Sequence, residues 1–262
     1  MALTKVDKSV SSTPGIVDNS DATAITITSS EEVGIGTTTP NSYAFNDPAK
    51  LVVANTSGHS TVSIASSTTS IGYLAFADGT SGTARYPGSL QYNHNSNYMA
   101  FHTNDGTERM KIDSSGNITT GNHPIFMAIE PAQTAGDANN VIVFGSENHD
   151  QGGHYNTSNG RFTAPVAGKY FFTVSILFQP NASGNSHYAR LTFRKNGSGS
   201  TKYAESLNTA FTAGNTTTSN YQSLSQSTII SLAANDFVDV TNSGTMSTYG
   251  TNYGSFAGFL VG

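Results

Sequence analysis

The chain has 262 residues, of which 11% are charged, whereas soluble domains carry roughly a quarter. A formal net charge of -5 excludes the basic surface that nucleic acid or anionic membrane would need, so we expect neither as a partner. Cysteine is absent, which excludes a disulfide framework and a thiolate metal site. Ser, Thr, Asn and Gly supply the polarity instead, and because they favour turns and short strands, the composition predicts an all-β class.

The first ten residues lack the apolar core of a secretory signal, and no later stretch is long and apolar enough to cross a bilayer. We therefore expect a soluble protein that is made in the cytoplasm without membrane insertion. The composition nevertheless suits a β-protein that works outside the cell, a combination found in virion parts.

Before Gly121 the apolar residues come in short clusters separated by Gly, Ser, Thr and Asn. This pattern is typical of short strands and turns, and no cluster has the spacing of an amphipathic helix. Strands this small cannot bury enough surface alone to offset the entropy of ordering them. We therefore expect several copies to wind together as a β-rich stalk. The clusters lie at residues 24–27, 33–35, 51–54, 62–64, 71–76 and 98–101.

Three segments of this half resemble modules of bacteriophage tail fibres and appendages. They are residues 33–40 (VGIGTTTP), 74–82 (LAFADGTSG) and 98–117 (YMAFHTNDGTERMKIDSSGN). The resemblance covers most of residues 22–120. It implies a virion protein whose N-terminal segment attaches to a tail or baseplate protein.

From Pro124 onward the strand patterns become longer and more regular. In residues 168–178 every second side chain is apolar, which predicts a strand with one buried face. The inward side chains are those of Tyr170, Phe172, Val174, Ile176 and Phe178. Further strands are expected at residues 221–232, 237–242 and 255–261.

Residues 187–194 repeat the alternation and end at a turn. Asn196-Gly197 predicts a hairpin because both residues tolerate positive φ. We expect Ala189, Leu191 and Phe193 to point inward and Arg190, Thr192 and Arg194 to point outward.

Seven residues of this half stand at the spacings that mark the globular head of complement subcomponent C1q. They are Phe144, Asp150, Tyr155, Phe162, Gly168, Tyr170 and Phe172. Residues 232–240 and 256–261 agree with the same signature, whereas Val174 stands where the family has an aromatic residue. The resemblance implies a jelly roll like that of tumour necrosis factor, a two-sheet antiparallel sandwich packed as a homotrimer.

The predicted fold is thus all-β, with an N-terminal β-rich intertwined fibre stalk followed by an antiparallel jelly-roll sandwich in a homotrimer. Residues 1–45 would form the virion-attachment segment, residues 46–122 the stalk module and residues 123–262 the head. The stalk would enter the head beside the C terminus, as in the heads that this one resembles.

We expect no catalytic site, no metal and no cofactor. His149 and His154 flank Asp150 in the best candidate cluster for metal or acid-base chemistry, but a Gly-Gly loop without a nearby third ligand predicts a polar turn. His94 and His102 could instead meet their symmetry mates on a threefold axis and bind a metal, although stalk histidines more often pack or face solvent. The serines sit in no Gly-x-Ser-x-Gly elbow, and no phosphate-binding loop is present.

Successive connections of an antiparallel roll alternate between its two ends, and this places the long loops together. Residues 179–186, 208–220 and 243–254 would share one end, and the short turns 196–200 and 233–235 would share the other end with the C terminus. Aromatic rings and amides in such loops suit sugar or protein recognition. The receptor-binding candidates are Asn181, Asn185, Phe211, Met246, Tyr249, Asn252 and Tyr253.

These patterns favour a trimeric phage tail-fibre protein whose distal head binds a host-cell surface receptor, either a glycan or an outer-membrane protein, for adsorption. It would act in the virion after synthesis in the host cytoplasm. An alternative is a purely structural virion protein, a neck or baseplate decoration or a fibre cap, in which the head serves only trimerisation. A polysaccharide-degrading tail spike is a third hypothesis.

Overall fold

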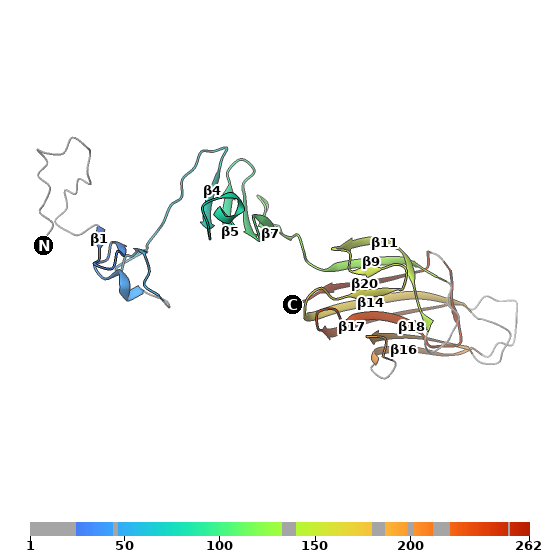
Figure 1. Cartoon of the computed structure of the whole chain (residues 1–262). Helices are drawn as coiled ribbons and strands as arrows, with labels where there is room; N and C mark the ends of the chain where they lie inside the picture. Colours follow the sequence, from blue (N-terminus) through green and yellow to red (C-terminus); the bar gives the residue numbers. More distant parts are fainter. Residues whose placement is uncertain are drawn as a thin grey trace, which may run out of the picture.

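The computed structural model describes residues 25–43, 47–132, 140–179, 187–198, 202–211, 221–250 and 252–262. Figure 1 shows three β-structured parts in chain order, of which the C-terminal part is the largest. Within these residues the helical segments are two 3-10 turns, η1 (Pro40–Tyr43) and η2 (Gly82–Arg85), so the all-β prediction is confirmed. In the described part of the chain no helix has the length and apolarity needed to span a membrane.

The N-terminal part is a sheet of three short strands. β1 (Ile25–Ile27) pairs antiparallel with β2 (Val33–Ile35), and β2 pairs parallel with β3 (Leu51–Val53). Because β3 joins this sheet, the boundary drawn after residue 45 divides a unit that extends to Val53. The first 24 residues of the expected attachment segment lie outside the described part.

The middle part is a five-stranded antiparallel meander, which we call the stalk sheet. Its strands follow the chain order, from β4 to β8. Residues 62–64 form no strand, contrary to expectation, whereas β5 was not predicted because its few apolar residues are interrupted by polar ones. The strands are β4 (Ile71–Phe76), β5 (Gly88–Asn93), β6 (Tyr98–Thr103), β7 (Thr107–Ile112) and β8 (Ile118–Thr120).

The C-terminal part is a sandwich of two antiparallel sheets, as the predicted jelly roll requires. One sheet has the order β11-β9-β20-β14-β17, and β19 also pairs with β14; we call it the β14 sheet. It contains β9 (Ile125–Pro131), β11 (Phe144–Gln151), β14 (Gly168–Gln179), β17 (Gln222–Leu232), β19 (Ser247–Thr248) and β20 (Gly254–Leu260).

The second sheet has the order β12-β13-β18-β15-β16, and β10 also pairs with β18; we call it the β18 sheet. It contains β10 (Asn140–Val141), β12 (Tyr155–Asn156), β13 (Arg161–Thr163), β15 (His187–Lys195), β16 (Lys202–Phe211) and β18 (Phe237–Asn242). The strands expected at residues 221–232, 237–242 and 255–261 are therefore confirmed within a residue or two.

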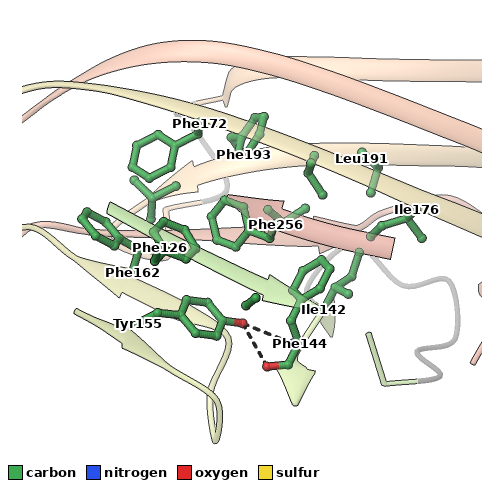
Figure 2. Close-up of a cluster of buried hydrophobic side chains, with 14 of the residues drawn as sticks. Phe126, Ile142, Phe144, Tyr155, Phe162, Phe172, Ile176, Leu191, Phe193 and Phe256 are labelled. Carbon is green, nitrogen blue, oxygen red and sulfur yellow. Dashed lines mark hydrogen bonds between the residues drawn. The ribbon is translucent and has the colours of Figure 1, made fainter. Parts of the chain in front are cut away.

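Aromatic rings fill the space between the two sheets (Figure 2). The ring of Phe172 is fully buried and lies 5.5 Å from that of Phe162 and 5.9 Å from that of Phe256, measured between centroids. The hydroxyl of Tyr155 accepts a hydrogen bond from the backbone N–H of Phe144 over 3.2 Å. Burial raises the pKa of this tyrosine. All five inward residues predicted for β14 are buried, so the predicted face is confirmed.

The inward residues predicted for β15, among them Leu191 and Phe193, are likewise buried, and the predicted outward direction of the alternate residues is confirmed. Thr192 and Arg194 do lie on the outer face, yet both are buried there. The guanidinium of Arg194 donates to both carboxylate oxygens of Asp239 on the adjacent β18, over 2.8 and 3.1 Å, and that carboxylate is fully buried. The pair satisfies a charge that burial alone would make costly.

The register places the connections as loop parity predicts. The Cα partners Phe178 and Gln222 bring the ends of β14 and β17 together at the long-loop end. At the opposite end Val261 N–H donates to Lys169 O over 2.7 Å, which places the C terminus there. Leu260 N–H donates to Pro124 O over 3.0 Å, so the chain from the preceding sheet also enters at this end.

Asp236 holds the two turns of the short-loop end together. Asn196 Nδ2 and Lys195 Nζ each donate to its carboxylate over 2.7 Å, and so does Ala233 N–H. Asn196 Oδ1 accepts in turn from Phe237 N–H. The hydrogen bonds from Asn196 and Lys195 lower the pKa of Asp236 to about 2.

Replacing the central ring tests the core. Phe172→Ala should lower the free energy of unfolding of the head by ~3–5 kcal/mol, because it removes a fully buried ring and leaves a cavity. Denaturant unfolding at a fixed protein concentration measures the change. Lys169→Ala, at an exposed position of the same strand, should alter it by less than about 0.5 kcal/mol. An effect below about 1 kcal/mol for Phe172→Ala would contradict the placement of its ring.

Acid should weaken the contribution of Asp236. Its pKa lies below the ordinary value of 3.8, so its stabilisation is complete above that value and is lost as the pH falls toward about 2. We expect Asp236→Asn to lower the free energy of unfolding by ~0.5–1 kcal/mol at neutral pH, since the site lies at the surface. Unfolding of both proteins at pH 7 and near pH 2 should show this difference shrinking in acid. An undiminished difference there would contradict the role of the carboxylate.

Candidate functional site

The receptor-binding candidates fall into three groups. Asn181 and Asn185 lie outside the described residues, and Phe211 is the last residue of β16, with its side chain outside the described part. Met246 is fully buried in the core of the sandwich, so its expected exposure on a loop was wrong. The backbone explains this, because Met246 N–H donates to Tyr188 O over 3.2 Å and turns the segment back over the sandwich.

Two of the remaining candidates, Tyr249 and Tyr253, form a cluster with a tyrosine that the sequence analysis missed. The ring of Tyr249 lies 4.6 Å from that of Tyr221 and 5.1 Å from that of Tyr253, between centroids. Tyr221 and Tyr253 are 43% and 52% exposed, which leaves two rings open to solvent. Tyr221 directly precedes β17 at the end of a predicted long loop, and this position was the one available signal for it. We call these residues the tyrosine cluster.

Backbone hydrogen bonds hold the cluster against the C-terminal end of β14. Tyr249 N–H donates to Leu177 O over 2.8 Å, and Leu177 N–H donates to Tyr253 O over 2.9 Å. Asn252, the candidate between the two tyrosines, is exposed and has φ of 75°, a conformation that asparagine tolerates. A hydrogen bond with Tyr221 raises the pKa of the Tyr249 phenol above its ordinary value.

The outer face of the β14 sheet carries a second group of exposed apolar residues, at the end away from the tyrosine cluster. At the stalk end of this face, direct pairing across four strands joins Ile125, Phe259, Phe171 and Ile229 into one apolar row. Phe259 is 39% and Ile229 58% exposed, so the single chain leaves the row open to solvent. We call it the apolar row. Exposed apolar residues gathered in this way mark a surface that another molecule covers.

Hydroxyl groups lie between the apolar row and the tyrosine cluster. Ser225 Oγ hydrogen-bonds to Ser175 Oγ over 2.9 Å, and Ser227 Oγ to Thr173 Oγ1 over 3.0 Å. Each of these hydroxyls thus already has one hydrogen-bond partner on the neighbouring strand. The face is therefore uncharged along its middle and can meet another uncharged surface without burying an unpaired ion.

The His-Asp-Gln-Gly-Gly-His segment begins as the end of β11, and the predicted polar turn follows from Gly152. Asp150, a residue of the head signature, accepts from His154 N–H over 3.0 Å and from Tyr155 N–H over 2.9 Å. Gly152 and Gly153, which lie between Asp150 and His154, both have positive φ. Across the described ranges, no group of three or more His, Cys, Asp or Glu side chains is placed to hold a metal ion.

The joint between stalk and head is tied by side-chain hydrogen bonds. Gln151 Nε2, at the end of β11, donates to Thr120 O over 3.1 Å and to Gly121 O over 2.6 Å. These carbonyls belong to the end of β8 and the residue after it. The head thereby holds the chain directly where the stalk sheet ends.

Comparisons with known proteins agree with this architecture. The C1q domain model matches residues 125–261, from the first strand of the β14 sheet to the end of its last one. The globular domain of zebrafish complement 1qA protein is 16% identical, with a TM-score of 0.41, over 53% of this chain and 98% of that one. Eiger TNF from S. frugiperda is 10% identical, with a TM-score of 0.39, over 53% of this chain and 93% of that one.

No curated protein matches the chain significantly. The family match nevertheless spans just over half of the chain, and the buried signature residues, the antiparallel two-sheet sandwich and the entry of the chain beside its C terminus all lie within it. By this match and this fold, the chain belongs to the C1q domain family.

Proposed function

We propose that this chain is a trimeric fibre protein of a bacteriophage tail and that the far end of its C1q-type head binds a host-cell surface molecule. The observation that carries the proposal is the placement of the exposed tyrosine cluster at the end of the head opposite to the entering stalk. An end that points away from the stalk is the first to meet a cell. The fibre-like segments at residues 33–40, 74–82 and 98–117 support the virion context.

The homotrimer is supported by the family and by the outer face of the β14 sheet. C1q and TNF-like domains commonly form homotrimers. In this chain the apolar row leaves Phe259 and Ile229 exposed on the outer face of the β14 sheet, and covering the row removes both side chains from water. Copies of the same chain present the same row, so a closed symmetric assembly covers it on every copy.

Ligand chemistry follows from the residues exposed at the far end. The rings of Tyr221 and Tyr253 offer apolar area at a small cost in conformational entropy, and their hydroxyls and the amide of Asn252 offer hydrogen bonds. Neutral rings beside amides suit a glycan or a polar protein surface. No charged side chain belongs to the tyrosine cluster, so electrostatic attraction is not its main source of affinity.

The trimer is tested by mass. Light scattering of the full chain at micromolar concentration should give the mass of three copies. Phe171→Asp should shift the mass toward one copy, because it places a charge in the apolar row, whereas Thr163→Asp, exposed on the β18 sheet, should leave the trimer intact. A stable single copy for the unaltered chain would refute the trimer.

Binding is tested at the tyrosine cluster. Tyr249→Ala combined with Tyr253→Ala should reduce adsorption of virions carrying the variant by at least about tenfold, since such rings dominate binding energy. The melting temperature of the trimer should stay nearly unchanged, because exposed substitutions cost little stability. A variant with Ser198→Ala, on the short-loop end, serves as the control.

Two other outcomes assign the rings differently. Normal adsorption with a lowered melting temperature would place the tyrosine cluster in the contact between copies and move the receptor site elsewhere on the head. Normal adsorption with normal melting would contradict a role for these rings in either process. Malformed virions in place of poorly adsorbing ones would favour the structural alternative.

A further inference from the structure

The strand pairing of the stalk sheet gathers its large apolar side chains on one face. Residues paired directly across antiparallel strands share a face, and positions two apart along a strand do too. Leu74, Leu90, Phe101 and Met110 are joined in one such row. With the adjacent rows they make up the apolar stalk face, which consists of Leu74, Phe76, Leu90, Tyr92, Met99, Phe101, Met110, Ile112 and Ile118.

The apolar stalk face is open to solvent in the single chain. Six of its nine side chains are more than a third exposed: Tyr92 and Met99 at 37%, Phe101 at 39%, Leu74 at 50%, Phe76 at 62% and Ile118 at 64%. Scattered apolar residues are normal on a protein surface, but a contiguous patch built from five strands marks an interaction surface. The opposite face differs, since it carries Gln91 and Lys111.

Two observations identify what covers this face. None of its nine side chains is charged, so identical faces can meet around a symmetry axis through apolar contacts. The nearest charge is that of Arg109, at the register shift beside Met110, whose Nε donates to Thr103 Oγ1 over 3.1 Å. The hydrogen bonds of Gln151 to Thr120 and Gly121 also hold the end of the stalk sheet against the head. Heads that associate therefore bring their stalk sheets together at a high effective concentration, which favours contact between copies over contact with another protein.

We propose that the apolar stalk face is a second interface between copies of this chain, in which three stalk sheets pack their apolar faces toward a common axis. The inference rests on the trimeric head proposed above, but it concerns different residues and a different sheet. It gives the fibre two separate apolar seams, one along the β14 sheets of the heads and one inside the stalk.

Cysteine labelling tests this seam, because the unaltered chain has no cysteine. Leu74 and Tyr73 are adjacent residues of β4 on opposite faces, and each is 50% exposed in the single chain. In the full-length protein, Leu74→Cys should react with a maleimide at least about tenfold more slowly than Tyr73→Cys, and denaturant should remove the difference. Ile118→Cys and Thr119→Cys repeat the comparison on β8, in case the first pair disturbs folding.

Light scattering of the same samples separates this inference from the trimeric head. A mass of three copies with slow labelling at positions 74 and 118 supports the stalk seam. A mass of three copies with equal labelling on both faces overturns the seam and leaves the trimeric head intact. A mass of one copy overturns the head trimer and, with it, the seam.

Discussion

Aromatic packing between the two sheets is the interaction on which the head depends. Phe172 and Phe256 come from neighbouring strands of the β14 sheet, and Phe193 reaches them from the β18 sheet, with ring centroids about 6 Å apart. A chain without disulfides has only such burial to offset the entropy of ordering its strands. Val174, where the resemblance to the C1q signature predicts an aromatic residue, is nevertheless buried with the rest of the inward face of β14.

A sheet has two faces, and this chain covers only one face of two of its sheets. The β18 sheet is the exception, because Arg194 and Asp239 pair on its outer side and neutralise each other there. The apolar row on the β14 sheet and the apolar stalk face have no such polar cover. Neither set of side chains contains a charged residue, so association of identical chains removes apolar area from water.

The two ends of the head differ in structure. The short-loop end is fixed by Asp236 and by the bonds of the C terminus and the entering chain to β14 and β20. Long connections and exposed tyrosines lie at the other end, although one of these connections contributes Met246 to the core. Recognition surfaces commonly occur on loops held by a rigid scaffold, and in this jelly roll the exposed tyrosines lie at the end away from the entering chain.

The sequence by itself determined the all-β class, the buried face of β14 and the end at which the long loops gather, because strand period and loop parity are local properties. Tertiary structure alone decided that Arg194 is buried, since this depends on Asp239 lying 45 residues away on the adjacent strand. It also decided that Met246 joins the core and that Tyr221 meets Tyr249. Such contacts are set by the register of distant strands, which no short stretch of sequence encodes.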